Sequence, residues 1–321
     1  MRTRLAGWML PVLKGLVTIG LFAILARSID IRRTAEFLGG TSISLFLGAC
    51  GVMVLQALIA IVRWRQVMLH QRFPLPFGSL TRFFWLGLFF NQVLPSTVGG
   101  DAARAYCLVR QGCGIGSASV AVLLDRMCGM VGLVLLVFIS LPLSFHYITD
   151  EATRWGVVLV AVGAAVAISF VLILDRLTAR FRHWRIARGM TALSRDARGL
   201  LFSGGPGIRL VSLSVVVHLI SVAAMAVLAI AAKLDVHWLA FVIVVPLASL
   251  LMTVPVSVAG WGVREGVMVV GLGYAGMDAE KAVALSILYG LLLLVVALPG
   301  GFVWLLDGRR QAAIQKTLRS G

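Results

Sequence analysis

Two short stretches place proline, glycine and arginine in otherwise apolar sequence. They are LPSTVGGDAAR at residues 94–104 and VPVSVAGWGVR at residues 254–264. Proline ends an incoming helix because it lacks a backbone donor, and the small residues that follow it allow a tight turn. The free N–H groups at the start of the next helix attract anions, and an arginine one turn further adds a full positive charge. Arg104 and Arg264, with these helix starts, therefore predict a cradle for a phosphate or carboxylate group.

The candidate binding residues lie in and beside these two stretches. They are Asn91, Gly99, Gly100, Asp101, Arg104, Asp125 and Arg126 in the first half of the chain, and Gly260, Trp261, Gly262, Arg264 and Glu265 in the second. Asp101 fits either a helix N-cap or a contact with substrate or proton. Glu265 follows Arg264 directly and is a candidate counter-charge. Charges inside a membrane cost about 2.5 to 3.5 kcal/mol each on insertion scales, so we expect these groups to line a cavity or to pair internally.

Other polar residues near the stretches have ordinary alternatives. Asn91 can present its amide to a cavity, or it can cap or pack a helix. Asp125 and Arg126 are adjacent and point about 100 degrees apart on a helix, so we do not expect both to face the same partner. One of them can bridge to the charges of the first stretch, or the pair lies at an ordinary membrane boundary. His218 fits a proton relay or a hydrogen bond to a neighbouring helix, and Trp261 can stack on a headgroup or wedge the turn.

The elements that must position these residues are membrane spans. The chain has 321 residues, of which 60% are hydrophobic and only 13% charged, which excludes an ordinary soluble domain. Since a span needs roughly 20 apolar residues, six spans are predicted, at about 10–26, 43–62, 118–141, 155–174, 210–232 and 282–306. We expect the first span to be an uncleaved segment rather than a signal peptide. The four cysteines contain no CxxC pair and are expected to be buried thiols.

The formal net charge of +16 indicates which loops face the cytoplasm, and we do not interpret it as a sign of nucleic-acid binding. Eight arginines fall between Arg176 and Arg209, and arginine-rich loops between spans mark the cytoplasmic side and attract anionic lipids. This rule places on that side residues 1–11, 63–82, 176–209 and the tail 307–321, and it places the loops around Asp150 and Asp235 outside. The loop at 27–36 fits least well. Both termini are therefore predicted to be cytoplasmic.

Two apolar regions, at about 83–116 and 238–276, do not fit as full crossings. A single crossing in each would move the arginine-rich loop at 176–209 to the outside, against the positive-inside rule. Re-entrant hairpins that enter and leave on one side keep every strongly basic loop cytoplasmic. Irregular backbone at membrane depth requires burial in protein or a wet cavity, so these hairpins are expected to line one.

The two stretches also belong to an internal repeat with an offset of 160 residues. Identical residues coincide at Pro95/Pro255, Val98/Val258, Gly100/Gly260 and Arg104/Arg264. Each half, at about 1–145 and 150–310, contains two spans, a hairpin and a third span. Because each half crosses the membrane an odd number of times, the two halves must be inverted. Paired interrupted segments in inverted halves indicate a transporter binding site near the membrane midplane.

The motifs FFNQVLPSTVGGDAARAYCLVRQG, VAVLLDRMCGM and VPVSVAGWGVREG resemble those of the lysylphosphatidylglycerol synthase transmembrane region family of flippase-like membrane proteins. The resemblance covers nearly the whole chain. By resemblance, the candidate residues other than Asn91 and Trp261 occupy the family's motif positions. In the best-known members this region moves an aminoacylated lipid that a fused synthase domain produces, and other relatives are linked to polyprenyl-sugar synthesis or hopanoid export. Since the sequence ends about 15 residues past its last span, we expect no synthase domain and no aminoacyl transfer.

The resulting prediction is an all-α polytopic membrane protein with a single membrane domain over residues 1–321. We expect a lipid flippase for an anionic, phosphate-bearing lipid, with no cofactor, no metal and no nucleic acid. The alternatives are a membrane enzyme acting on a polyprenyl-phosphate-linked sugar or a lipid headgroup, with Asp101, Asp125 or Glu265 as base, and a membrane partner of a separate synthase. A homo-oligomer is also compatible with the sequence.

Overall fold

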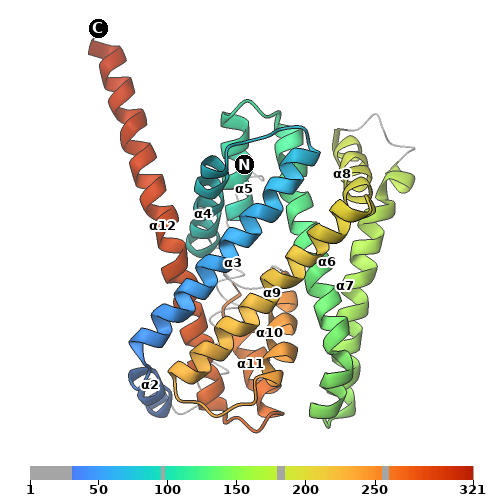
Figure 1. Cartoon of the computed structure of the whole chain (residues 1–321), viewed down its shortest axis with the longest axis vertical. Helices are drawn as coiled ribbons and strands as arrows, with labels where there is room; N and C mark the ends of the chain where they lie inside the picture. The colour runs from blue at the N-terminus through green and yellow to red at the C-terminus, as the bar shows by residue number, and fades with distance from the viewer. Residues whose placement is uncertain (1–30, 95–97, 179–184, 255–259, 321) are drawn as a thin grey trace, which may run out of the picture.

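The structure is a computed structural model that describes residues 31–94, 98–178, 185–254 and 260–320 (Figure 1). All regular secondary structure in these ranges is helical. The helices are α2 (Ile31–Gly39), α3 (Ile43–His70), α4 (Phe77–Val93), α5 (Gly99–Arg110), α6 (Ile115–Tyr147), α7 (Glu151–Thr178), α8 (Arg185–Leu201), α9 (Gly205–Ala231), α10 (Leu239–Met252), α11 (Val263–Gly273) and α12 (Ala279–Ser320). The predicted all-α polytopic fold is confirmed.

Five segments are long and apolar enough to cross a membrane. They are Ile43–His70, Ile115–Tyr147, Glu151–Leu177, Gly205–Ala231 and Ala279–Leu306. Each of them contains nearly all of one predicted span. The predicted span at 10–26 lies outside the described residues. The chain is therefore a multi-pass membrane protein.

Two pairs of shorter helices interrupt this pattern. The helices α4 and α5 pack together, as do α10 and α11, and none of the four is longer than 17 residues. At about 1.5 Å per residue, none reaches the roughly 30 Å of a bilayer core. The pair α4–α5 begins and ends at the end of the molecule that carries α8, and the pair α10–α11 begins and ends at the opposite end (Figure 1). The prolines Pro95 and Pro255, predicted to end α4 and α10, lie outside the described residues.

Small residues and buried hydrogen bonds hold the long helices together. The helices α3 and α9 lie side by side at the centre, where the Gln56 side chain donates to the Val217 carbonyl at 3.0 Å. The helices α6 and α9 come so close that a Cβ added at Gly132 would lie 2.4 Å from the Ser214 side chain. Small residues permit such close backbone approach in membranes, where apolar burial alone does not drive helix association.

The two short pairs pack on the long helices in matching ways. The helix α4 lies against α12, while α10 lies against α6. Likewise α5 contacts α6, and α11 contacts α12. Trp85 on α4 donates its indole N–H to the Val296 carbonyl of α12 at 3.0 Å. Each short pair therefore packs against both α6 and α12, the long helix that follows its own pair in sequence and the long helix that follows the other pair.

Several segments predicted as basic loops are partly helical. The helix α3 continues to His70, so the predicted loop at 63–82 begins inside a helix, and Arg63 is buried rather than exposed. The helix α2 occupies most of the predicted loop at 27–36, and α12 extends to Ser320. The helix α3 continues through Arg63 because this buried charge has Asp125 as its partner inside the protein.

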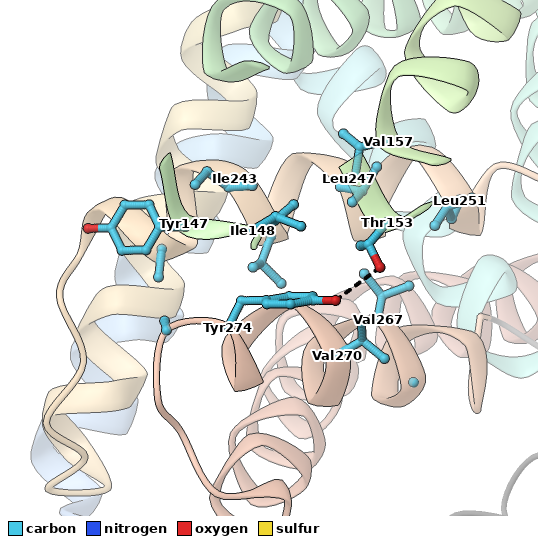
Figure 2. Close-up of a pocket in the computed structure, with 15 residues that line it drawn as sticks. Tyr147, Ile148, Thr153, Val157, Ile243, Leu247, Leu251, Val267, Val270 and Tyr274 are labelled. Atoms are coloured by element: carbon cyan, nitrogen blue, oxygen red, sulfur yellow. Dashed lines mark hydrogen bonds between the residues drawn. The ribbon is translucent and has the colours of Figure 1, made fainter. Parts of the chain in front are cut away.

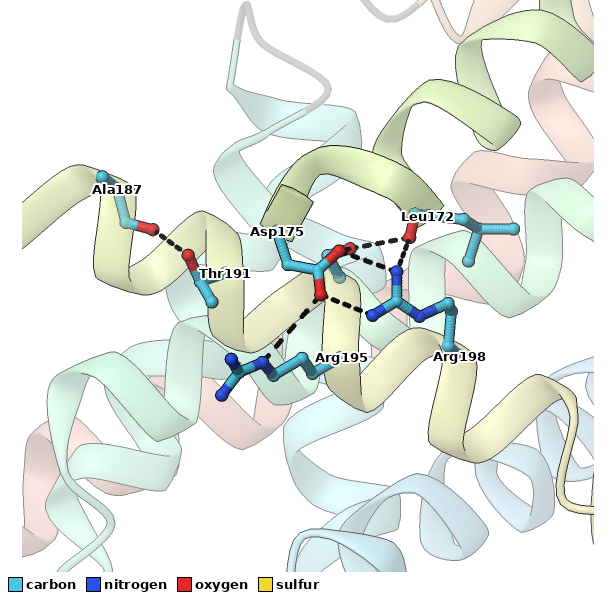
Figure 3. Close-up of polar contacts among 7 residues, drawn as sticks. Leu172, Asp175, Ala187, Thr191, Arg195 and Arg198 are labelled. Carbon is cyan, nitrogen blue, oxygen red and sulfur yellow. Dashed lines mark hydrogen bonds and ion pairs between the residues drawn. The ribbon is translucent and has the colours of Figure 1, made fainter. Parts of the chain in front are cut away.

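The predicted loop at 176–209 contains α8, which a carboxylate fastens to α7 (Figure 3). Asp175 accepts hydrogen bonds from both terminal nitrogens of Arg198, at 2.7 and 2.5 Å. This bidentate bond raises the pKa of the Arg198 guanidinium. The Ser194 hydroxyl donates to the Leu172 carbonyl at 2.8 Å. One arginine of this segment thus has a structural role, while Arg195 is more exposed and lies 3.9 Å from the same carboxylate.

Candidate functional site

A cavity of about 550 Å³ lies between helices of the two halves of the chain. Residues from α3, α4, α5, α6, α9, α10 and α12 line it. Its volume falls in the range of about 300 to 1,000 Å³ that is typical of ligand sites. The polar side chains of its wall belong to Gln56, Arg63, Asn91, Gln92, Asp101, Arg104, Asp125, Arg126, His218, Ser249 and Thr253.

A buried carboxylate between two arginines forms the centre of this wall. Asp125 on α6 accepts from Nε of Arg63 on α3 at 3.0 Å and from Nη2 of Arg104 on α5 at 2.8 Å. The Asp125 side chain is 2% exposed, and both arginine side chains are 8% exposed. Arg63 also lies 3.4 Å from the Ser214 hydroxyl on α9. Four helices thus meet at one carboxylate that balances only half of the positive charge around it.

Arg104 is held in place but keeps one donor unused. Its guanidinium carbon lies 3.9 Å from the ring centroid of Trp64 and 5.2 Å from that of Phe84, in cation–π geometry. Its Nε atom is buried and has no hydrogen-bond partner among the described residues. An unsatisfied buried donor costs about 1 to 3 kcal/mol, more when it is charged. Arg104 lines the cavity, but this Nε atom is enclosed by the protein and is not itself exposed to the cavity.

A second ion pair crosses the same two helices. Nε of Arg126 lies 2.5 Å from Asp101, and the two side chains are 37% and 14% exposed. Asp101 is the third residue of α5, whose N-cap is Val98, so the N-cap alternative for Asp101 is wrong. Both Asp125 and Arg126 reach α5, and they do so through different partners, as their angular separation on α6 requires.

The turn between α4 and α5 depends on glycine. The Asn91 side-chain oxygen accepts from the backbone N–H of Gly100 at 2.9 Å, which ties the end of α4 to the start of α5. A Cβ at Gly100 would lie 2.1 Å from the Gly87 carbonyl oxygen, and one at Gly99 would lie 2.6 Å from the Leu94 side chain. These two positions therefore exclude any side chain. Asn91 lines the cavity and also anchors the turn.

The second stretch forms a closed ion pair. Nη2 of Arg264 donates to Glu265 at 2.7 Å, and Nε of Arg264 donates to the Ser286 hydroxyl at 3.0 Å. The other Glu265 oxygen accepts from the Gly262 backbone N–H at 2.6 Å and so caps α11. The side chains of Arg264 and Glu265 are 2% and 0% exposed. Glu265 is thus the counter-charge of Arg264, and the pair is buried within the protein.

The structure does not bring the two arginine stretches into one cradle. None of the five candidates of the second stretch lines the cavity. Trp261 lies flat against Arg264, with the guanidinium carbon 4.5 Å from its ring centroid. The helix α11 starts at Val263 because Gly260 and Gly262 have positive φ values of 80° and 86°. Arg264 is therefore the second residue of its helix, whereas Arg104 lies a full turn inside α5.

Sequence reasoning missed five polar residues of the cavity wall, namely Gln56, Arg63, Gln92, Ser249 and Thr253. Gln56 and Arg63 lie seven residues apart, or about two helical turns, and so share one face of α3. This spacing of polar residues in an apolar run was the signal that could have revealed them. His218 contacts the Gly129 carbonyl of α6 at 3.0 Å, which is the simpler of the two roles considered for it, although it also lines the cavity.

The wall of the cavity has an excess of positive charge. Three arginines (Arg63, Arg104 and Arg126) face two aspartates (Asp101 and Asp125). In the described part of the chain, no group of three or more His, Cys, Asp or Glu side chains is placed to hold a metal ion. The four cysteines are free thiols, of which two are buried. The cavity thus offers guanidinium and amide donors to an anion.

The fold and the cavity define the class: an α-helical multi-pass membrane protein with a charged internal cavity. The family described as lysylphosphatidylglycerol synthase TM region matches residues 12–301 of the chain. The match covers nearly the whole chain, and the protein belongs to this family, as the sequence motifs predicted. No curated protein sequence matches the chain.

Proposed function

We propose that this protein moves an anionic, phosphate-bearing lipid across the bacterial inner membrane, with the headgroup passing through the charged cavity. The observation that carries the proposal is the cavity wall in which three arginines, Arg104 among them, face only two carboxylates. A phosphate presents several acceptor oxygens and pairs with guanidinium forks in bidentate geometry. The lipid tails remain in the surrounding bilayer. No catalytic role is assigned to the charged residues.

The ion pairs of the wall supply a mechanism for binding and release. Asp125 pairs with both Arg63 and Arg104. An arriving phosphate competes with Asp125 for the guanidinium donors of these two arginines. Because Asp125 restores the original pairs when the lipid leaves, neither arginine is left without a counter-charge. This exchange keeps the cost of emptying the site low.

The short helix pairs and their packing support alternating access. We propose that α4–α5 and α10–α11 are re-entrant hairpins of an inverted repeat, entering from the cytoplasm and from outside respectively. The packing supports this repeat, in which α4, α5 and α6 correspond to α10, α11 and α12. The contact of α4 with α12 then corresponds to that of α10 with α6, and the contact of α5 with α6 corresponds to that of α11 with α12. Movement of one half against the other would open the cavity to either leaflet. Both termini are cytoplasmic in this arrangement.

The proposal specifies the charge of the lipid headgroup and does not single out one lipid. A phosphatidylglycerol headgroup carries the phosphate that Arg104 requires. An aminoacylated headgroup keeps this phosphate and adds an ammonium group, for which Asp101 lies on the same wall. A zwitterionic phosphatidylcholine headgroup has no net charge, so it gains less than phosphatidylglycerol from a wall of net positive charge.

Native mass spectrometry of the purified protein tests headgroup binding. We expect the wild-type protein to retain phosphatidylglycerol or its aminoacylated form in preference to phosphatidylcholine from a mixed micelle. The variant Arg104→Gln should lose this preference. The matched control is Arg110→Gln, which removes an exposed charge from the end of the same helix and should retain it. Equal retention by the two variants, both correctly folded, would overturn the proposal.

A further inference from the structure

A second cavity lies at the end of the molecule opposite α8, outside the charged site (Figure 2). Its volume is about 260 Å³. It lies between the corner of α6 and α7 on one side and α10 and α11 on the other, and it is partly open to the surroundings of the protein. It is larger than the apolar cavity of about 150 Å³ that stays dry and binds benzene in a well-studied engineered protein.

The wall of this second cavity is apolar and its few hydroxyl groups are already used. No charged residue lines it. The Thr153 and Tyr274 hydroxyls lie 3.0 Å apart in a hydrogen bond, and Thr153 also bonds to the Asp150 carboxylate at 2.6 Å. The Tyr147 hydroxyl points away from the cavity (Figure 2). The wall therefore offers little to water or to a headgroup, both of which need several polar partners.

The helix α10 separates the two cavities. Leu247 and Leu251 line the apolar cavity, whereas Ser249 and Thr253 line the charged one. Each pair is spaced by four residues, so the two pairs lie on two different faces of the same helix. One short helix thus divides a site for charge from a site for hydrocarbon.

We propose that the apolar cavity binds one acyl chain of a membrane phospholipid. An apolar wall without atoms packed against it forfeits dispersion contacts, and a flexible chain restores them. The five apolar spans place the protein in a medium whose bulk component is phospholipid acyl chains, so this occupant is available at high concentration. The wall contacts only hydrocarbon, and binding does not depend on the headgroup. The inference stands whether or not the charged cavity carries a lipid.

A glycine in the wall allows the cavity to be filled by mutation. Gly266 on α11 lines the cavity, and a Cβ added there would meet no atom within 4 Å. The variant Gly266→Phe therefore places a ring in the space assigned to the chain. Gly273, on the same helix, also has open space around its Cβ position and does not line the cavity. Gly273→Phe is the matched control for helix propensity and added apolar surface.

Photolabelling with phosphatidylglycerol that carries a diazirine in the middle of one acyl chain tests this site. In proteoliposomes of wild-type protein, we expect labelled peptides from α10, α11 and the α6–α7 corner. Gly266→Phe should lose this labelling and Gly273→Phe should keep it. Undiminished labelling of these peptides in a folded Gly266→Phe protein would overturn the proposal.

A titration keeps the test decisive even if Gly266→Phe fails to fold. Labelling of a bound chain saturates as the mole fraction of probe rises, whereas labelling of a lipid-facing residue such as Phe302 on α12, which is 67% exposed, rises in proportion. Proportional labelling at both places would contradict a binding site. The same diazirine chain on phosphatidylcholine should label the cavity equally well, so this result is independent of any headgroup selectivity. Labelling by a polyprenyl phosphate probe alone would also refute the acyl-chain assignment.

Discussion

The substitution Asp125→Asn removes the counter-charge of two buried arginines while it preserves side-chain shape. Asp125 is 2% exposed, and its partners Arg63 and Arg104 come from two other helices. Asparagine keeps one acceptor oxygen for one guanidinium, but it leaves both positive charges uncompensated inside the protein. Removing one partner of a buried ion pair costs about 3 to 5 kcal/mol. We expect a loss of this size in the free energy of unfolding.

The assay is reversible unfolding in mixed micelles by increasing mole fraction of sodium dodecyl sulfate. Asp278→Asn is the control because Asp278 forms an exposed pair with Lys281 at 2.8 Å, with side chains 64% and 38% exposed. Exposed pairs contribute about 0 to 1 kcal/mol. If Asp125→Asn destabilises the protein no more than Asp278→Asn, the expectation that uncompensated arginines at the buried centre of the cavity wall are costly is refuted.

A double variant separates lost charge balance from lost packing. Arg63→Gln alone leaves one arginine against Asp125, and Arg63→Gln combined with Asp125→Asn leaves one uncompensated arginine instead of two. We therefore expect the double variant to be more stable than the sum of the single losses predicts, as residues in one network do not act additively. Strict additivity would show that the groups do not interact.

Three further predictions concern the turns of the fold. Gly100→Ala should cost about 1 to 3 kcal/mol in the same titration, because its Cβ would overlap a carbonyl of α4, whereas Gly116→Ala, with open space around it, should not destabilise the protein. Glu265→Gln should cost about 3 to 5 kcal/mol because it leaves the buried Arg264 without its carboxylate; a loss below about 1 kcal/mol, the limit of an exposed pair, would contradict this account. Asp150 accepts hydrogen bonds from the hydroxyl and the backbone N–H of Thr153, and these bonds lower the pKa of the Asp150 carboxyl. This contribution to the first turn of α7 is present above the unfolded pKa of about 3.9 and is lost as pH falls through the lower folded value, so hydrogen exchange there should accelerate on acidification in the wild type but not in Asp150→Asn.

The fold was predictable because it depends on patterns of composition. Long apolar runs gave five described spans, and the proline and glycine stretches located both short helix pairs. The predicted helix ends were wrong where a charged residue was assumed to lie outside the membrane span. Arg63 lies well inside α3 because Asp125, 62 residues later, compensates its charge. A pairing of that kind depends on tertiary contacts that no local pattern reports.

The candidate site was predictable in its first half only. The sequence treats Arg104 and Arg264 as equivalent, since both follow the same turn motif. The structure separates them because Nη2 of Arg264 bonds to the adjacent glutamate and Nε bonds to a serine on α12, and neither Arg264 nor Glu265 lines the cavity. Arg104 has its carboxylate on another helix and keeps a free donor. Differences in the partners, rather than in the motif, decide which arginine faces the cavity.

The most direct test of the central claim is translocation by the purified protein in liposomes. A phosphatidylglycerol with a fluorescent group on one chain reports its leaflet through reduction by external dithionite. The account predicts that wild-type protein exchanges this lipid between leaflets faster than the phosphatidylcholine equivalent, and that folded Arg104→Gln protein does not. Transport of phosphatidylglycerol by Arg104→Gln at the wild-type rate would contradict it.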